Sequence, residues 1–207
     1  MIPKIIHQVF LGQTDNLEQY PHFGENMEKW QNWAEKNGWE YNFYDKTDII
    51  NLIDNGDLLR FYINLRYNWC RIDFCRYLII NKFGGLYVDL DIAPNDGKYE
   101  TLSSYIMTRD YILGLWDNKK TGKTEITNSL IGFKAGELTD LIEYSIAETK
   151  SKSQMEIYNK WKIRFFLQTT GVRMFARWCK IKKYTYDRNI YKYITDTCTA
   201  TWLNNFN

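Results

Sequence analysis

Residues 71–76 are Arg-Ile-Asp-Phe-Cys-Arg, and residues 83–91 are Phe-Gly-Gly-Leu-Tyr-Val-Asp-Leu-Asp. Apolar side chains before the glycines recur at helical spacing, at Ile72, Cys75, Ile79 and Phe83. Gly84 or Gly85 can take the left-handed conformation that closes a helix. The next three residues are typical of a short buried strand, and Pro94 ends the regular run. The stretch therefore predicts a helix from Trp69 to Phe83, a glycine stop and a strand that ends in two carboxylates.

Four charged residues of this stretch are candidates for a common site. Asp73 and Arg76 are spaced so that they share one face of the predicted helix. Asp89 and Asp91 have one residue between them, and on a strand both side chains would point to the same side. Two carboxylates aimed together repel unless a cation lies between them, and such hard oxygen ligands suit Mg²⁺ or Mn²⁺. An Asp-x-Asp pair alone is common on solvated surfaces, but here a buried strand and a helix with Asp73 and Arg76 precede it.

The composition is that of a globular protein with one sizeable core. The chain has 207 residues, of which 44% are hydrophobic and 25% are charged. Predicted strands and helices alternate through the first half, which opens an α/β fold. We expect strands at 4–10, 39–44, 111–116 and 125–133, and helices at 25–36, 47–53 (capped by Thr47), 57–65, 137–149 and 151–168. No linker divides the chain, so residues 1–207 are expected to form one domain, either complete or part of a longer protein.

The net charge of +2 is unevenly distributed. Between Lys152 and Lys192 there are 11 Lys and Arg residues against two acids, Glu156 and Asp187. Such a segment can face a phosphate-bearing donor, an anionic acceptor or a membrane surface, or it can be a solvated face. Aromatic residues interleave these charges, as they do in proteins that bind single-stranded nucleic acids. Core packing explains the helical apolar periodicity of the segment, so no nucleic-acid partner is expected.

The cysteines and histidines argue against a structural zinc site. The chain has four cysteines without a Cys-x-x-Cys pair and only two histidines. We interpret His7 as a strand histidine with satisfied hydrogen bonds, and Cys70 and Cys75 as small buried hydrophobes. The sequence has no signal peptide and no apolar run of membrane-spanning length. The expected location is therefore a reducing, cytoplasmic one, with no membrane span.

The combination Asp-x-x-Arg and Gly-Gly-x-Tyr-x-Asp-x-Asp resembles the signature of the DXD-motif sugar-binding glycosyltransferases. That family includes yeast initiating mannosyltransferases, bacterial and viral capsule-type transferases and the catalytic domains of clostridial glucosylating toxins. The matching residues are Asp73, Arg76, Gly84, Gly85, Tyr87, Asp89 and Asp91. The resemblance implies an α/β fold of the GT-A type, with one nucleotide-sugar-binding domain and a mixed central sheet flanked by helices.

The resemblance extends more weakly to other parts of the chain. The opening Ile-Pro-Lys-Ile-Ile-His-Gln is similar to the family's first strand, and this match places Val9 and Phe10 in the pocket for the nucleotide base. Asn128 matches an Asn that reaches the donor sugar or the acceptor, although a plain polar strand residue is an equal alternative. Thr170-Gly171-Val172 resembles a Thr-Gly-Pro turn of the family, with Val172 in place of the proline.

The C-terminal segment resembles the family's closing segment, which covers the diphosphate and in some members completes the metal shell. On that register Trp202 matches a Trp, Thr201 matches a Ser, and Asp196 replaces a His. A carboxylate can bind a hard cation as well as His can. The alternative is a frayed terminus with one buried Trp.

The resemblance implies a metal-dependent hexosyltransferase. The expected donor is a nucleoside-diphosphate sugar, with UDP-sugars such as UDP-glucose favoured, and the expected acceptor is a hydroxyl group, most simply of a glycan, with retention of configuration. The implied catalytic residues are Asp73, Arg76, Asp89 and Asp91; sugar ligands are Asp73, Arg76, Tyr87 and Asn128; nucleotide ligands are Val9, Phe10, Asp89, Thr201 and Trp202; and ligands of Mn²⁺ or Mg²⁺ are Asp89, Asp91 and Asp196.

Two alternatives stay open at this point. The first is a nucleotide-sugar or glycan-binding module without turnover, because the closing segment departs from the family pattern. The second is an aspartate-nucleophile phosphatase, which also has Asp-x-Asp after a strand. That class usually has Thr or Val two residues after the second Asp and an early motif, whereas this chain has Ala93 there and a motif far from its start.

Overall fold

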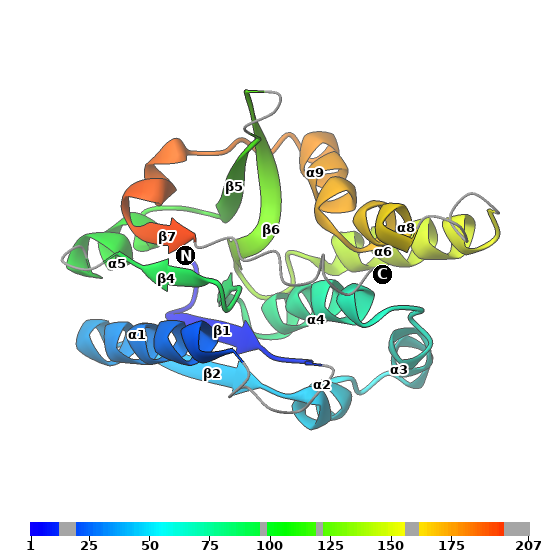
Figure 1. Ribbon diagram of the computed structural model, residues 1–207, viewed down its shortest axis with the longest axis horizontal. Coiled ribbons are helices and arrows are strands. Elements are labelled where there is room, and N and C mark those ends of the chain that lie inside the picture. The colour runs from blue at the N-terminus through cyan, green and yellow to red at the C-terminus, as the bar shows by residue number, and fades with distance from the viewer. Residues whose placement is uncertain (13–19, 96–98, 119–121, 156–161, 197–207) are drawn as a thin grey trace.

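The computed structural model describes residues 1–12, 20–95, 99–118, 122–155 and 162–196, and its central element is a five-stranded mixed sheet (Figure 1). The strand order is β2-β1-β3-β6-β5. Strand β1 (Ile5–Val9) pairs in parallel with β2 (Glu40–Tyr44) and β3 (Gly85–Val88). Strand β6 (Lys123–Phe133) runs antiparallel to β3 and to β5 (Ile112–Asn118). A second sheet pairs β4 (Ile92–Pro94) with β7 (Ile194–Asp196).

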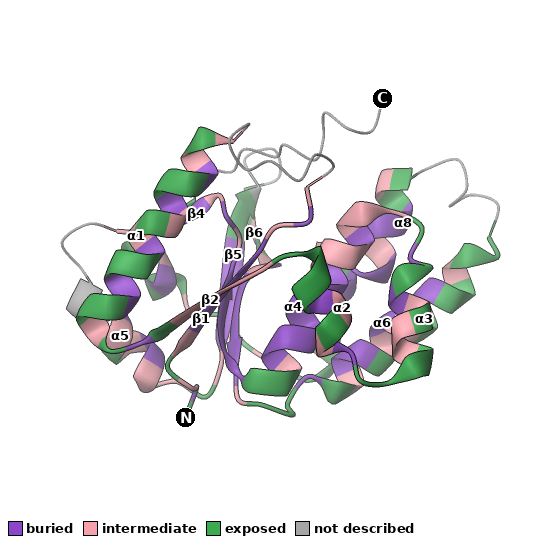
Figure 2. Ribbon diagram, turned by 90° about the horizontal axis from the view of Figure 1, so that it is seen from below, coloured by how far each residue is buried: buried purple, intermediate pink, exposed green. Residues whose placement is uncertain are grey.

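Helices cover both faces of the central sheet (Figure 2). One face packs against α1 (Pro21–Asn37) and α5 (Tyr99–Met107), and the 3₁₀ helix η2 (Arg188–Lys192) contributes to the same core. The helices of the opposite side are α2 (Lys46–Leu52), α3 (Gly56–Ile63), α4 (Asn68–Phe83), α6 (Thr139–Ser153), α8 (Lys162–Thr169) and α9 (Val172–Ile181). The mixed sheet with flanking helices is the predicted fold class.

Strand β3 shows why the chain builds two cores. Leu86 and Val88 are buried against Trp30 and Trp33 of α1 and belong to one core. Tyr87 lies between them in sequence and belongs to the other core, with Phe74 of α4. Successive side chains of a strand point to opposite faces, so a strand that is apolar at every position is buried on both sides.

The turn from α4 into β3 depends on its two glycines. Gly84 has φ +67° and Gly85 has φ +97°, so both occupy the region that glycine tolerates best. A Cβ on Gly85 would lie 2.6 Å from the Ile5 carbonyl oxygen and 2.9 Å from His7 Nε2. The missing side chain therefore allows β3 to lie directly beside β1.

His7 is the satisfied strand histidine that we predicted. Its side chain is fully buried, with Nε2 2.8 Å from the Gly84 carbonyl oxygen and Nδ1 3.0 Å from the Tyr44 hydroxyl. Burial lowers the pKa of His7 to about 4, so the ring is neutral near pH 7.

Several predicted element boundaries are wrong, including the following three. Strand β3 ends at Val88, and Asp89 to Asp91 form a turn in which the Ile92 N–H donates to the Asp89 carbonyl at 3.1 Å. The strand spacing that would aim both carboxylates to one side therefore does not apply. Helix α2 is capped by Asp45, whose carboxylate accepts from the backbone N–H of Thr47, so Thr47 is not the cap. Helix α6 continues to Ser153, past the break predicted near residue 150.

Candidate functional site

The predicted site residues gather at the edge where the parallel strands end. Val9 ends β1, Tyr44 ends β2, and their Cα atoms are partners in the sheet. His7 pairs with Tyr87, so two residues further along the same register Val9 is level with Asp89. In open α/β sheets ligands bind outside the carboxyl ends of the strands. The start of α4, with Asp73 and Arg76, reaches the same edge from the side (Figure 1).

Arg76 is the centre of a buried polar cluster. Its Nη2 lies 2.9 Å from Asp73 Oδ1 and 3.3 Å from Asp89 Oδ1, and its Nη1 donates to the Asn128 carbonyl at 2.7 Å. Burial alone would lower the pKa of Arg76, but Asp89, Tyr87 and Asp73 raise it well above the usual value. The guanidinium therefore stays charged and joins α4, β6 and the turn after β3.

Asp73 is the most enclosed carboxylate of the cluster. It is 3% exposed, and its Oδ1 also accepts from Asn128 Nδ2 at 2.9 Å. Its Oδ2 is buried and has no hydrogen-bond partner among the described residues, and a Cβ on Gly171 would lie 3.1 Å from that oxygen. Burial raises the pKa of Asp73 to about 7, although Arg76 opposes the shift. An unsatisfied buried oxygen of this kind is an acceptor that a ligand hydroxyl could satisfy.

Asp89 is the exposed end of the same cluster. Its side chain is 27% exposed, and Oδ1 accepts from the Tyr87 hydroxyl at 2.7 Å. The Tyr87 ring lies beneath the Arg76 guanidinium, with Cζ 4.8 Å from the ring centroid. Burial raises the pKa of Asp89 as well, and Arg76 and Tyr87 oppose that shift. Asp89 is thus held rigidly before any ligand arrives.

Helix α1 fixes the turn that carries Asp91. The carbonyl of Leu90 accepts from Asn26 Nδ2, and that of Ile92 accepts from Trp30 Nε1, both at 2.8 Å. Asn26 and Trp30 support the Asp-x-Asp turn although we did not predict either as a site residue. Their only sequence signal is an amphipathic helix, whose pattern does not reveal which backbone groups its buried polar atoms reach.

The small sheet brings the backbones of the two remaining metal candidates, Asp91 and Asp196, near each other. Asp196 pairs with Ile92 in β4, directly after Asp91. Asp196 is exposed and Asp91 is partly exposed, and both oxygens of Asp89 contact Tyr87 or Arg76. Within the described ranges there is no group of three or more carboxylate, His or Cys side chains that could hold a metal. Asp91 and Asp196 fit a hard cation that takes its other ligands from phosphate and water.

The predicted nucleotide residues are only partly described. Phe10 follows β1, and its N–H donates to the Tyr44 carbonyl at 3.1 Å. The Phe10 ring lies over Gly12, because a Cβ added to Gly12 would be 2.3 Å from Phe10 Cζ. Val9 is buried in the core, so its side chain does not face a ligand at this edge. Thr201 and Trp202 lie outside the described residues.

Tyr77 is a site residue that we did not predict. Its hydroxyl accepts from Asn128 Nδ2 at 2.8 Å and donates to the Thr170 carbonyl at 2.7 Å. It therefore orients the amide that contacts Asp73 and ties the cluster to the segment before α9. The position four residues after Asp73 is the available signal, because residues i and i+4 share a helix face.

Comparison with known proteins places this chain among glycosyltransferases. The family described as "Glycosyltransferase sugar-binding region containing DXD motif" matches residues 13–108. Inositol phosphoceramide mannosyltransferase 3 of Schizosaccharomyces pombe is 29% identical over 143 residues, which are 65% of this chain and 34% of that protein. An uncharacterized glycosyltransferase of Acanthamoeba polyphaga mimivirus is 31% identical over 97 residues, which are 45% of this chain and 37% of that protein. The chain thus spans about a third of the length of these relatives.

The fold has a counterpart among solved structures. PaToxG Glycosyltransferase superimposes with a TM-score of 0.54 at 15% identity, over 87% of this chain and 70% of that one. In the described part of the chain no helix has both the length and the apolar character that a membrane crossing requires. The resemblance seen in the sequence is therefore confirmed: residues 13–108 match the model of the DXD-containing sugar-binding region of glycosyltransferases, and the fold is of the GT-A type.

Proposed function

We propose that the protein transfers a hexose from a nucleoside-diphosphate sugar, with UDP-sugars favoured, to a hydroxyl group of a glycan, with retention of configuration. The observation that carries this proposal is the Arg76 cluster, which links Asp73, Asp89 and Asn128 at the carboxyl edge of the parallel strands. A rigid set of donors and acceptors at this place suits the hydroxyl groups of a ribose and a sugar.

Each part of the donor has a matching group at this edge. The ring of Phe10 offers a stacking face for the base, and Asp89 offers a partly exposed carboxylate for ribose or sugar hydroxyls. Asp73 supplies an acceptor oxygen deeper in the cluster, and Asn128 can supply its amide oxygen because its Nδ2 already donates to Asp73 and Tyr77, with Tyr87 beneath Arg76. Because Arg76 and Tyr87 fix Asp89 in advance, binding costs little side-chain ordering.

Asp91 and Asp196 would hold the divalent cation. When bound, such an ion neutralises the charge that develops on the departing diphosphate. Asp91 is well suited to this task, because Asn26 and Trp30 of α1 hold the backbone on both sides of it. The pairing of β4 with β7 supports the assignment of Asp196 as its neighbour.

The transfer itself needs no nucleophilic side chain. The acceptor hydroxyl oxygen forms a bond to the anomeric carbon from the face that the diphosphate leaves. The bond from that carbon to the diphosphate oxygen breaks, and its electron pair stays on the diphosphate. The hydroxyl proton passes to the departing diphosphate. Arg76 contributes positive charge beside the sugar, and the buried cluster keeps water away from it.

Release of UDP from UDP-glucose with and without Mn²⁺ tests this proposal. We expect release that depends on the ion, and at least a hundredfold loss in Asp91→Asn, in the range seen when a group that stabilises developing charge is removed. Asp54→Asn is the control, because Asp54 is an exposed carboxylate paired with Lys82. Equal release by the two variants would refute the role of Asp91. Binding of the donor without any release would instead support a binding module.

A further inference from the structure

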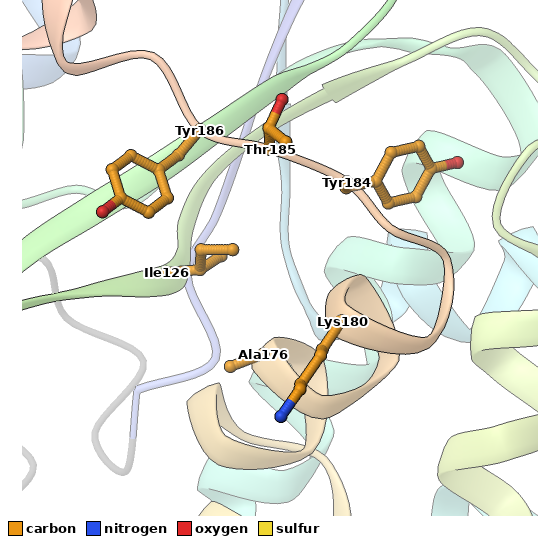
Figure 3. A pocket seen from close by; sticks show the side chains of 6 residues that line it. All are labelled: Ile126, Ala176, Lys180, Tyr184, Thr185 and Tyr186. Atoms are coloured by element: carbon orange, nitrogen blue, oxygen red, sulfur yellow. The ribbon is translucent and has the colours of Figure 1, made fainter.

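A cavity is formed by residues of β6, of α9 and of the segment that follows α9. It has a volume of about 450 Å³ and is lined by Ile126, Ala176, Lys180, Tyr184, Thr185 and Tyr186, which we call the tyrosine pocket (Figure 3). In Figure 3 the two tyrosine rings lie on either side of Thr185, with Ile126 of β6 and with Ala176 and Lys180 of α9 below them in the view. Its volume is in the range of small-molecule sites, which reach from about 300 Å³ upward.

The wall that carries the tyrosines is rigid. The Tyr184 N–H donates to the Cys179 carbonyl at 2.9 Å, and the Tyr184 ring contacts those of Tyr111 and Trp178 at centroid distances of 4.6 and 5.3 Å. The Thr185 N–H donates to the Tyr111 hydroxyl at 3.1 Å. Tyr186 is nonetheless 45% exposed, so a fixed backbone presents an accessible ring.

Two elements connect the tyrosine pocket with the Arg76 cluster. On β6, Ile126 of the pocket is two residues from Asn128, or roughly 7 Å along a strand. On α9, Ala176 is five residues from Gly171, which abuts Asp73, or roughly 8 Å along a helix. A ligand in the pocket would therefore lie about one sugar ring away from the residues proposed to hold the donor sugar.

The α9 side of the pocket is basic. Arg173, Ala176 and Lys180 follow one another at intervals of three and four residues, so they form one stripe along the helix. Arg173 and Lys180 are exposed, and neither takes part in an ion pair among the described residues. By contrast, Arg177 and Lys182 of the same region pair with Glu148 and Asp140 of α6.

The nearby acids do not cancel this charge. Asp187 follows Tyr186 but forms an ion pair with Arg109. Glu125 precedes Ile126 on β6, and adjacent residues of a strand point to opposite faces. The pocket thus combines aromatic rings, an apolar floor and a stripe of positive charge that leads toward the donor cluster.

We propose that the tyrosine pocket binds the acceptor and that the acceptor is an anionic saccharide, carrying a phosphate or a carboxylate. The sugar ring packs on Tyr186, and its anionic group pairs with Lys180, with Arg173 nearer the donor. This inference rests on the proposed function, because it names the acceptor of the same transfer. Charge complementarity selects this occupant over a neutral glycan.

Ligand-observed NMR titrations of the full chain test the inference, with UDP and the diamagnetic ion Mg²⁺ present so that anions do not report on the donor site. The probes are methyl β-glucuronide against methyl β-glucoside, and glucose 6-phosphate against glucose. We expect each anionic probe to bind about tenfold more tightly than its neutral partner, as one charge-assisted hydrogen bond implies. Lys180→Gln should remove this preference, and Tyr186→Ala should weaken both members of a pair about fivefold.

Lys150→Gln is the matched control, since Lys150 is an exposed lysine near the end of α6 and outside the pocket. Equal affinity for the anionic and neutral probes, no binding of either, or a preference that survives in Lys180→Gln would overturn the inference. A preference for only the phosphate or only the carboxylate would identify the group and support it. Failure of UDP to bind in the same titration would count against the proposed donor site. The comparison of anionic with neutral probes would still test whether the tyrosine pocket binds an anionic saccharide.

Discussion

Arg76 places one positive charge between two carboxylates that come from different parts of the fold. Asp73 lies on the same helix, and Asp89 lies on the turn after β3. Both carboxyl groups have a raised pKa because they are withdrawn from water, and the guanidinium opposes the shift in each case. The planar guanidinium also reaches the Asn128 carbonyl, so one side chain satisfies three groups at once.

Replacement of Arg76 by lysine should therefore be severe although it keeps the charge. A lysine ammonium cannot reach both carboxylates and the carbonyl together, and it leaves buried acceptors unpaired. We expect the free energy of unfolding to fall by about 3 kcal/mol and donor turnover to fall about a hundredfold. Urea denaturation and UDP release measure the two effects.

Arg60→Lys is the control for this substitution. Arg60 pairs with Asp57 on the surface of α3, where both side chains are more than three-quarters exposed. A surface pair of this kind should change stability by less than about 0.5 kcal/mol. Similar losses in Arg60→Lys and Arg76→Lys would contradict the importance of the buried cluster.

Sequence spacing was sufficient to predict part of this cluster. The pairing of Asp73 with Arg76 follows from their positions on one helix face. The contacts of Asn128 and Tyr77 do not, because they depend on how β6 and the segment before α9 pack against α4. The strand geometry expected for Asp89 and Asp91 was wrong, since the chain turns after Val88 and its backbone bonds locally.

The junction between α4 and β3 is the element that positions the Asp-x-Asp turn. The sequence was enough to predict the helix, the glycine stop and the strand, because each has a local signal. The irregular pairing of β6 with β5, with a register shift at Leu113 and Gly114, had no such signal. That irregularity lies where β6 carries Asn128, and it depends on contacts between strands.

Gly85→Ala should destabilise the protein strongly. The new Cβ would collide with the Ile5 carbonyl and with His7, at a φ that alanine rarely adopts. We expect a loss of about 3 kcal/mol or more in the free energy of unfolding. Gly56→Ala is the matched control, because Gly56 opens α3, has no heavy atom within 4 Å of its added Cβ and should gain up to about 1 kcal/mol from helix propensity. Comparable stability of the two variants in urea would show that the close approach of β3 to β1 is not required.

The whole molecule is a central sheet between two cores, and its stability should depend on pH through His7. Native His7 has a pKa of about 4, whereas the unfolded chain has the ordinary value of 6.5. As the pH falls from 6.5 to 4, His7 therefore takes up a proton in the unfolded state but stays neutral in the native state. The free energy of unfolding is therefore unaffected by His7 above pH 6.5 and falls progressively as the pH is lowered from 6.5 to 4.

The His7 contribution can be isolated by comparing variants. Between pH 7.5 and pH 4 the wild type should lose about 3 kcal/mol more stability than His7→Gln, which cannot titrate. Urea denaturation at a series of pH values measures the difference. Parallel pH profiles for the two proteins would contradict the buried neutral histidine.

The distribution of charge over the whole molecule has a structural explanation. Much of the basic excess of the C-terminal third is neutralised by acids from other elements, as in the pairs of Arg177 with Glu148 and Lys182 with Asp140. The sequence left open whether this segment faces a donor, an acceptor, a membrane or solvent. In the fold, α9 lies against β6 at the tyrosine pocket (Figure 1). We therefore propose that the basic residues of α9 face the acceptor in this pocket.

A thermal-shift series with UDP- and GDP-sugars, each with and without Mn²⁺, would test donor binding directly. A ligand that binds only the native state raises the melting temperature by mass action. We predict a rise of about 5 °C or more for a UDP-sugar at a hundred times its dissociation constant with Mn²⁺, and a much smaller rise without the ion. No shift with any donor, or the same shift without Mn²⁺, would contradict a metal-dependent nucleotide-sugar site at the edge built by Arg76, Asp89 and Asp91.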